Sequence, residues 1–163
     1  MTWALVSDST CEIRSIDHLA PDTAFYTVPL KIRMGEREYV DNAMLDTKAM
    51  LDAMANYNGP SSTACPAPEE WAEKFLLADQ VFAITITSSL SGSYNTAMII
   101  RDQLVAEHPE AELYVVDTLL ASIAEGFLVY EAIRQRDRGL TAKEMVDWAE
   151  EARYYIDAEF MVD

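Results

Sequence analysis

Apolar runs alternate with segments of helical periodicity along most of the chain. Continuous apolar runs at residues 3–6, 81–86 and 113–116 are typical of strands that are covered on both faces. Helical patterns predict helices over residues 47–57, 68–77, 94–107, 121–138 and 141–156. Strands that alternate with helices indicate an α/β fold with a mostly parallel sheet flanked by helices. We expect one such domain over residues 1–156.

Three segments before the third predicted helix are less regular. Residues 25–32 alternate between apolar and polar side chains and include Pro29, which suits an edge strand rather than a central one. Residues 37–40 are expected to return beside it as the second arm of a hairpin. Residues 61–68 combine hydroxyl side chains with prolines, which predicts a loop leading into the next helix.

Capping residues mark two of the helix starts. Asp46 precedes the first predicted helix as an N-cap. Thr141 and Glu144 form a capping box that opens the last one. Gly139 is well placed to end the helix before it.

Polar residues gather where the predicted strands end. Asp8, Ser9 and Thr10 follow the first strand, and Asp117 with Thr118 follows the run at residues 113–116. In parallel α/β sheets the ligands bind at the carboxyl ends of the strands. We therefore expect these clusters to lie at a common site, with the loop at residues 61–68 able to join them.

The longest polar cluster separates the strand at residues 81–86 from the helix that follows. It holds one glycine, Gly92, and five hydroxyl side chains: Thr87, Ser88, Ser89, Ser91 and Ser93. The free N–H groups of a helix start, together with the helix dipole, favour an anion. An ordinary serine-rich N-cap is the alternative interpretation.

Composition narrows the classes of ligand. The chain has 163 residues, half of them hydrophobic, and a formal net charge of -16. That charge opposes binding to nucleic acid or to an anionic membrane surface. No apolar run is long enough to insert into a membrane, and neither a signal peptide nor a cysteine-based metal or redox motif is evident, so we expect a cytoplasmic protein. An anionic ligand would have to be held by local, uncharged donors.

Catalytic arrangements are poorly supported. A serine hydrolase needs a base, and the histidines are only His18 and His108, the latter in a polar turn. The nucleophile-elbow and P-loop patterns are absent. We expect no catalytic residue, no metal and no cofactor. The remaining hypothesis is a binder of a small carboxylate whose hydrocarbon tail lies against apolar surface.

Five motifs together resemble the DegV family of fatty-acid-binding proteins over essentially the whole chain: Val6-Ser7-Asp8-Ser9-Thr10, Val28-Pro29-Leu30, Thr63-Ala64-Cys65-Pro66, Ser88-Ser89-Leu90-Ser91-Gly92-Ser93-Tyr94 and Val116-Asp117-Thr118. The resemblance implies a two-domain α/β protein that holds a long-chain acyl group between its domains. Matched by position, the family's carboxylate ligands are Thr63 and Ser91. The neighbouring hydroxyls of Ser93, Ser9 and Thr10 complete the expected lipid-binding set. Some members present the fatty acid to a separate fatty acid kinase, so such members are carriers rather than enzymes.

The chain departs from that family in two respects. Ala64 and Cys65 stand where the family has Ser and Gln. Residues 157–163 resemble the start of a strand that leads towards a second domain, which is expected to be absent. Two alternatives stay open: an interaction or regulatory module that keeps the fold without the lipid, and an enzyme acting on a small phosphorylated substrate. An uncovered apolar cleft should lead either to self-association, including a homodimer with exchanged tails, or to tight retention of a hydrophobic ligand.

Overall fold

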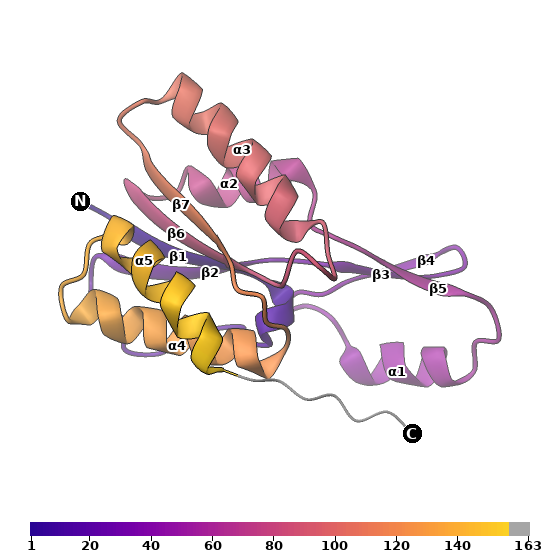
Figure 1. Ribbon diagram of the computed structural model, residues 1–163. Coiled ribbons are helices and arrows are strands. Elements are labelled where there is room, and N and C mark those ends of the chain that lie inside the picture. Colours follow the sequence, from indigo (N-terminus) through magenta and orange to yellow (C-terminus); the bar gives the residue numbers. More distant parts are fainter. Residues whose placement is uncertain (157–163) are drawn as a thin grey trace.

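A four-stranded parallel sheet forms the centre of the computed structural model, which describes residues 1–156 (Figure 1). The strand order is β2-β1-β6-β7, with every neighbouring pair parallel. The bounds of these strands are β1 (Trp3–Asp8), β2 (Thr23–Val28), β6 (Gln80–Thr85) and β7 (Glu112–Asp117). The predicted α/β class with a mostly parallel sheet is confirmed.

Helices cover both faces of this sheet (Figure 1). On one face lie α2 (Pro68–Phe75) and α3 (Ser93–Glu107), and on the other lie α4 (Ile123–Asp137) and α5 (Ala142–Ala152). Successive strand residues point to opposite faces, so β1 contributes Leu5 to the core under α4 and α5, and Val6 to the core under α2 and α3. This two-sided burial is the reason for the continuous apolar runs in the sequence.

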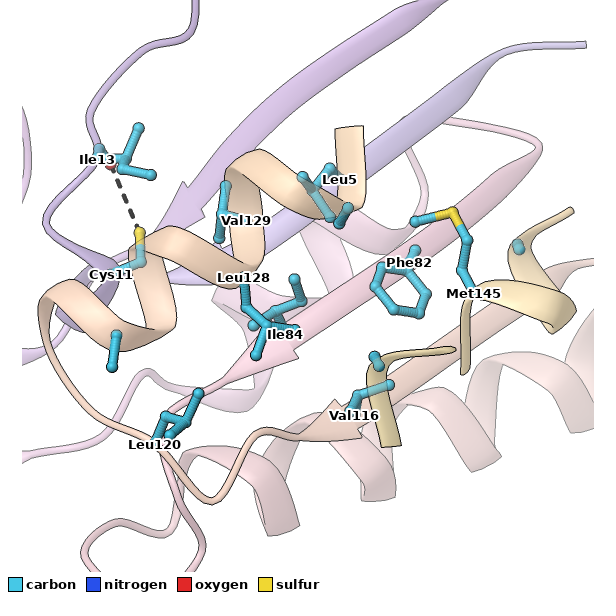
Figure 2. Close-up of a cluster of buried hydrophobic side chains, with 14 of the residues drawn as sticks. Leu5, Cys11, Ile13, Phe82, Ile84, Val116, Leu120, Leu128, Val129 and Met145 are labelled. Carbon is cyan, nitrogen blue, oxygen red and sulfur yellow. Dashed lines mark hydrogen bonds between the residues drawn. The ribbon is translucent and has the colours of Figure 1, made fainter. Parts of the chain in front are cut away.

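The core under α4 and α5 is drawn in Figure 2. Phe82 and Ile84 of β6 pack there with Leu128 of α4 and Met145 of α5, and all four side chains are fully buried. Replacing a buried Leu or Met with Ala typically costs about 2–5 kcal/mol. This core therefore fixes α4 on the sheet and, with it, the residues that α4 turns towards the end of β1.

A second, antiparallel sheet extends from one end of the first (Figure 1). Its strand order is β4-β3-β5, and the bounds are β3 (Lys31–Met34), β4 (Arg37–Val40) and β5 (Ser61–Ala64). Helix α1 (Thr47–Ala55) lies between β4 and β5 in sequence. The hairpin predicted at residues 37–40 is confirmed, because β4 pairs with β3.

Two predictions about these strands were wrong. The segment 25–32 is not one strand, because the chain leaves the parallel sheet after Val28 and enters the second sheet at Lys31. Pro29 has no N–H to donate, and the N–H of Leu30 is taken by the Ser9 hydroxyl. The segment predicted as a loop at residues 61–68 begins with β5, which pairs with β3. The sequence of β5 does not alternate between apolar and polar residues, so the pattern gave no sign of a strand.

Helix boundaries follow local hydrogen bonding. Asp46 caps α1 through the N–H of Ala49, and Thr141 with Glu144 forms the expected capping box of α5. Helix α4 starts two residues later than predicted because a turn with positive φ at Leu119 and Ser122 precedes it.

The last predicted helix is shorter than expected. It ends at Ala152, and a 3-10 turn, η2 (Arg153–Tyr155), follows it. The strand predicted within residues 157–163 lies outside the described residues, and the domain boundary at residue 156 stays a prediction. Among the helices described, none is long and apolar enough to cross a membrane.

Candidate functional site at the carboxyl edge of the sheet

The carboxylate of Asp8 organises the carboxyl edge of the sheet. Asp8 is the last residue of β1, is fully buried, and caps the short 3-10 turn η1 (Ser9–Cys11) by accepting the N–H of Thr10 at 3.2 Å. Its Oδ2 accepts the N–H of Ile86 at 3.0 Å and the hydroxyl of Ser93 at 2.6 Å. Ile86 and Ser93 flank residues 87–92, here called the hydroxyl loop. One buried carboxylate thus fixes both ends of that loop.

The polar cluster at the end of β7 holds the same loop from its other side. Asp117 Oδ1 accepts the N–H of Ser88 at 3.1 Å, and the N–H of Thr87 donates to the carbonyl of Leu120 at 2.8 Å. The three polar clusters predicted at the strand ends therefore meet at one edge, as parallel strands require.

Ser91 is the best-placed donor in the hydroxyl loop. Its Oγ accepts the N–H of Ser93 at 3.2 Å, which occupies a lone pair and leaves the hydroxyl proton free to donate elsewhere. Helix α3 begins here with Gly92 as a residue that provides no side-chain cap. The N–H groups of Tyr94 and Asn95 consequently have no partner within this 15-residue helix. The helix dipole adds to the attraction for an anion.

Thr63 lies on β5, and its contact with a ligand stays a prediction. Its side chain is exposed, and β5 ends one residue later. The loop that follows brings Cys65 against the start of α3: its Sγ lies 4.0 Å from Thr96 Oγ1, and 3.5 Å from where a Cβ on Gly92 would be. The fold thus brings the end of β5 and the Ser91 turn together, although they are distant in sequence.

The other three predicted ligands make hydrogen bonds within the protein. Ser93 is fully buried and donates to Asp8, while Ser9 Oγ accepts the N–H of Leu30 at 3.0 Å. Thr10 Oγ1 contacts Asp8 and, at 2.6 Å, Glu125 Oε2. These hydroxyls make hydrogen bonds that hold the loops around the site together. Their contact with a ligand stays a prediction.

Glu125 is a buried acid that the sequence reasoning missed. It lies in the first turn of α4, is fully buried, and accepts the hydroxyl of Ser7 at 2.9 Å. Burial first, and the charge of Asp8 second, raises the pKa of Glu125 well above its usual value. Burial also raises the pKa of Asp8, against the lowering effect of its hydrogen bonds to Ser93, Thr10 and Ile86. The sequence did hold one signal that Glu125 is buried. It lies three residues before Leu128 and four before Val129, which places this acid on the apolar face of the helix.

Apolar side chains border the site. Leu90 in the hydroxyl loop is 69% exposed, and Leu119 and Ile123, beyond the end of β7, are 46% and 72% exposed. A groove of about 390 Å³ runs between α4 and α5, but none of its lining residues belongs to the hydroxyl loop. Within residues 1–156, no three His, Cys, Asp or Glu side chains are grouped so that they could hold a metal.

Comparison with known proteins gives consistent matches. A family model described as an uncharacterised protein of the DegV family matches residues 2–163. A DegV domain-containing protein of Streptococcus gordonii is 38% identical over 146 residues, which is 90% of this chain and 52% of that protein. One of Streptococcus pneumoniae strain R6 is 35% identical over 147 residues, again 90% and 52%. The chain spans about half the length of the curated relatives it matches.

Solved structures match as well. The Fatty Acid Kinase (Fak) B3 protein of Streptococcus pneumoniae, loaded with linoleic acid, aligns with a TM-score of 0.90 at 33% identity, covering 94% of this chain and 55% of that one. A protein of Eubacterium eligens loaded with heptadecanoic acid aligns with a TM-score of 0.87 at 31% identity, covering 94% and 54%.

Proposed function

The chain belongs to the DegV family, and from that premise we propose that it binds a long-chain fatty acid at the carboxyl edge of its sheet. The carboxylate lies at the start of α3 and accepts hydrogen bonds from Ser91 and Thr63. The observation that carries this assignment is the Ser91 hydroxyl, whose proton is free at the start of a helix where Gly92 provides no side-chain cap.

The donors fit a single carboxylate. They are hydroxyl and N–H groups without charge, in a chain whose net charge of -16 repels anions at long range. Each hydrogen bond to a charged group contributes on the order of 1.5–3 kcal/mol. The hydrocarbon tail adds about 0.8 kcal/mol, gross, per buried methylene. Leu90 and the exposed apolar side chains beyond β7 provide surface for the first part of that tail.

We further propose that the protein is a carrier rather than an enzyme, and that it presents the fatty acid to a partner kinase. Support comes from the similar Streptococcus pneumoniae protein, which is named as a fatty acid kinase B3 protein and holds linoleic acid.

A second function is favoured by one observation. Ala64 and Cys65 remove a hydroxyl and an amide, relative to the family motif, and Cys65 lies against Gly92 at the start of α3. A protein that keeps the fold for interaction or regulation, without a lipid, would tolerate such a change.

Mass spectrometry of the purified protein before and after denaturation distinguishes the two functions. A carrier releases a long-chain acid. In titrations with oleic acid, Ser91→Ala should bind about tenfold more weakly or worse, because one charge-assisted hydrogen bond is lost. Ser89→Ala, which removes an exposed hydroxyl in the same loop, is the matched control and should bind as the wild type does.

Two outcomes would count against the carrier, and a third would count against Ser91 as the donor to its ligand. Absence of any acid together with absence of titratable binding would favour the interaction module. Binding of inorganic phosphate without acyl binding would favour an enzyme that acts on a phosphorylated substrate. Equal losses for Ser91→Ala and Ser89→Ala would remove Ser91 as the specific donor.

A further inference from the structure

Two buried carboxyl groups share one hydroxyl behind the hydroxyl loop. Thr10 Oγ1 lies within hydrogen-bond distance of Asp8 Oδ1 and 2.6 Å from Glu125 Oε2. A hydroxyl has a single proton to donate. If Thr10 donates to one carboxyl group, the other must donate to Thr10. One of the two acids therefore carries a proton.

The other hydrogen-bond partners of Asp8 and Glu125 indicate which of the two acids carries the proton. Asp8 also faces the N–H groups of Thr10 and Ile86, which can only donate, and the hydroxyl of Ser93. Each carboxylate oxygen of Asp8 therefore accepts one N–H that cannot accept a proton in return, which favours the ionised form of Asp8. Glu125 is hydrogen-bonded to the hydroxyls of Ser7 and Thr10, either of which can accept a proton as well as donate one, and no N–H of the described residues donates to it.

We propose that Asp8 is an ionised positioning residue for the head-group site and that Glu125 is its neutral partner, connected through Thr10. The hydrogen bonds then run in one direction: Ser7 donates to Glu125, the Glu125 proton goes to Thr10, and Thr10 donates to Asp8. Every proton in this series of hydrogen bonds then has an acceptor. The functional part of the inference rests on the proposed function, because it takes the Ser91 turn as the carboxylate site.

The ionised form of Asp8 sets the direction of the Ser91 hydroxyl. Because Ser93 gives its hydroxyl proton to Asp8, the Ser93 side chain is fixed and its N–H points at Ser91 Oγ. That N–H fills one lone pair of Ser91, which leaves the Ser91 proton free to donate to the ligand. The remaining titratable group next to the pair is the thiol of Cys11 in η1. Burial raises the pKa of that thiol to about 11, so it is neutral.

Infrared spectroscopy of the ligand-free protein tests the protonation assignment. At neutral pH the wild type should show the carbonyl stretch of a buried carboxylic acid, Glu125→Gln should lack it, and Asp8→Asn should keep it. A band that persists in Glu125→Gln and disappears in Asp8→Asn would reverse the assignment and overturn the proposal.

Oleic acid titrations test the positioning role. Glu125→Ala should lose about tenfold in affinity, and Glu125→Gln should restore it, because a glutamine amide donates to Thr10 and accepts from Ser7 as a neutral acid does. Asp8→Asn should lose at least as much, since an amide N–H would face the N–H and hydroxyl donors. Should Asp8→Asn fail to fold, Ser93→Ala is the substitute: it removes one donor to Asp8 and should weaken oleic acid binding to a similar extent.

Two results of the titrations would contradict the proposal: wild-type affinity in folded Asp8→Asn, and an affinity of Glu125→Gln no better than that of Glu125→Ala. If the wild type binds no oleic acid, the proposed function fails by itself. The infrared bands then still decide which carboxyl group carries the proton.

Discussion

Gly126 lies where α4 packs against η1, and replacing it with Ala should destabilise the protein even though Ala favours a helix more than Gly does. A Cβ at this position would lie 2.5 Å from the carbonyl oxygen of Cys11, closer than real Cβ contacts, which essentially never fall under 3.0 Å. The obstacle is backbone, so it cannot rotate away. Gly126→Ala must therefore move α4 away from η1 by about half an ångström. A shift of this kind is what an extra methyl group causes in a well-packed core.

The cost can be worked out from the contacts beside Gly126. Ala is better than Gly in a helix interior by about 1 kcal/mol, which is the gain. Overpacking costs about 1–3 kcal/mol. The same movement stretches the Glu125 hydrogen bonds to Thr10 and Ser7, now 2.6 and 2.9 Å, beyond the normal range, at about 1 kcal/mol each. The net loss in the free energy of unfolding should be about 2–4 kcal/mol, or roughly 4–16 °C in Tm.

Urea denaturation and calorimetry of the purified protein measure this loss. The matched control is Gly92→Ala, where the new Cβ would meet Cys65 Sγ at an ordinary 3.5 Å and φ is already -74°. That variant should change the free energy of unfolding by less than about 1 kcal/mol. A Gly126→Ala protein as stable as the wild type, or more stable, would refute the close approach of α4 to η1 and the hydrogen-bond network built on it.

Four further predictions follow from the described residues. The folded state holds the Glu125 proton at a pH where Glu125 in the unfolded chain, with a pKa near 4.5, releases it. The free energy of unfolding of the wild type should therefore fall relative to that of Glu125→Gln as the pH rises above 4.5. Urea titrations at several pH values test this, and the same pH dependence in both proteins would contradict it. Thiol titration should modify the half-buried Cys65 in the native protein and the buried Cys11, with its pKa of about 11, only after unfolding; native reactivity of both thiols would refute this order. Thr141→Ala should lower the free energy of unfolding by about 1 kcal/mol because it removes the α5 cap, and an unchanged urea midpoint would count against that cap. Phe127, 58% exposed on α4, should promote self-association, so light scattering should show less of it in Phe127→Ser, and a wild type that stays monomeric at high concentration would oppose this.

The sequence by itself determined the elements whose causes are local. The apolar runs of β1, β6 and β7 required burial on both faces, and the periodicity and caps of the helices placed their starts within about two residues. The polar clusters at the strand ends predicted a shared edge, because parallel strands have only one carboxyl edge. The assignment of Thr63 and Ser91 came from the family resemblance of the motifs, since hydroxyl-rich turns are also ordinary helix caps.

Only the tertiary structure decided the contacts between segments that are distant in sequence. Thr63 belongs to a strand because it pairs with Ile32, and no periodicity in residues 61–64 reports a partner that lies so far back in the chain. Glu125 is buried against Asp8 because α4 packs its first turn onto η1, across a separation of more than a hundred residues. A sequence pattern records which side chains need burial, but it does not record which polar groups will be buried together. The pairing of Asp8 with Glu125 through the Thr10 hydroxyl is for that reason a property of the fold.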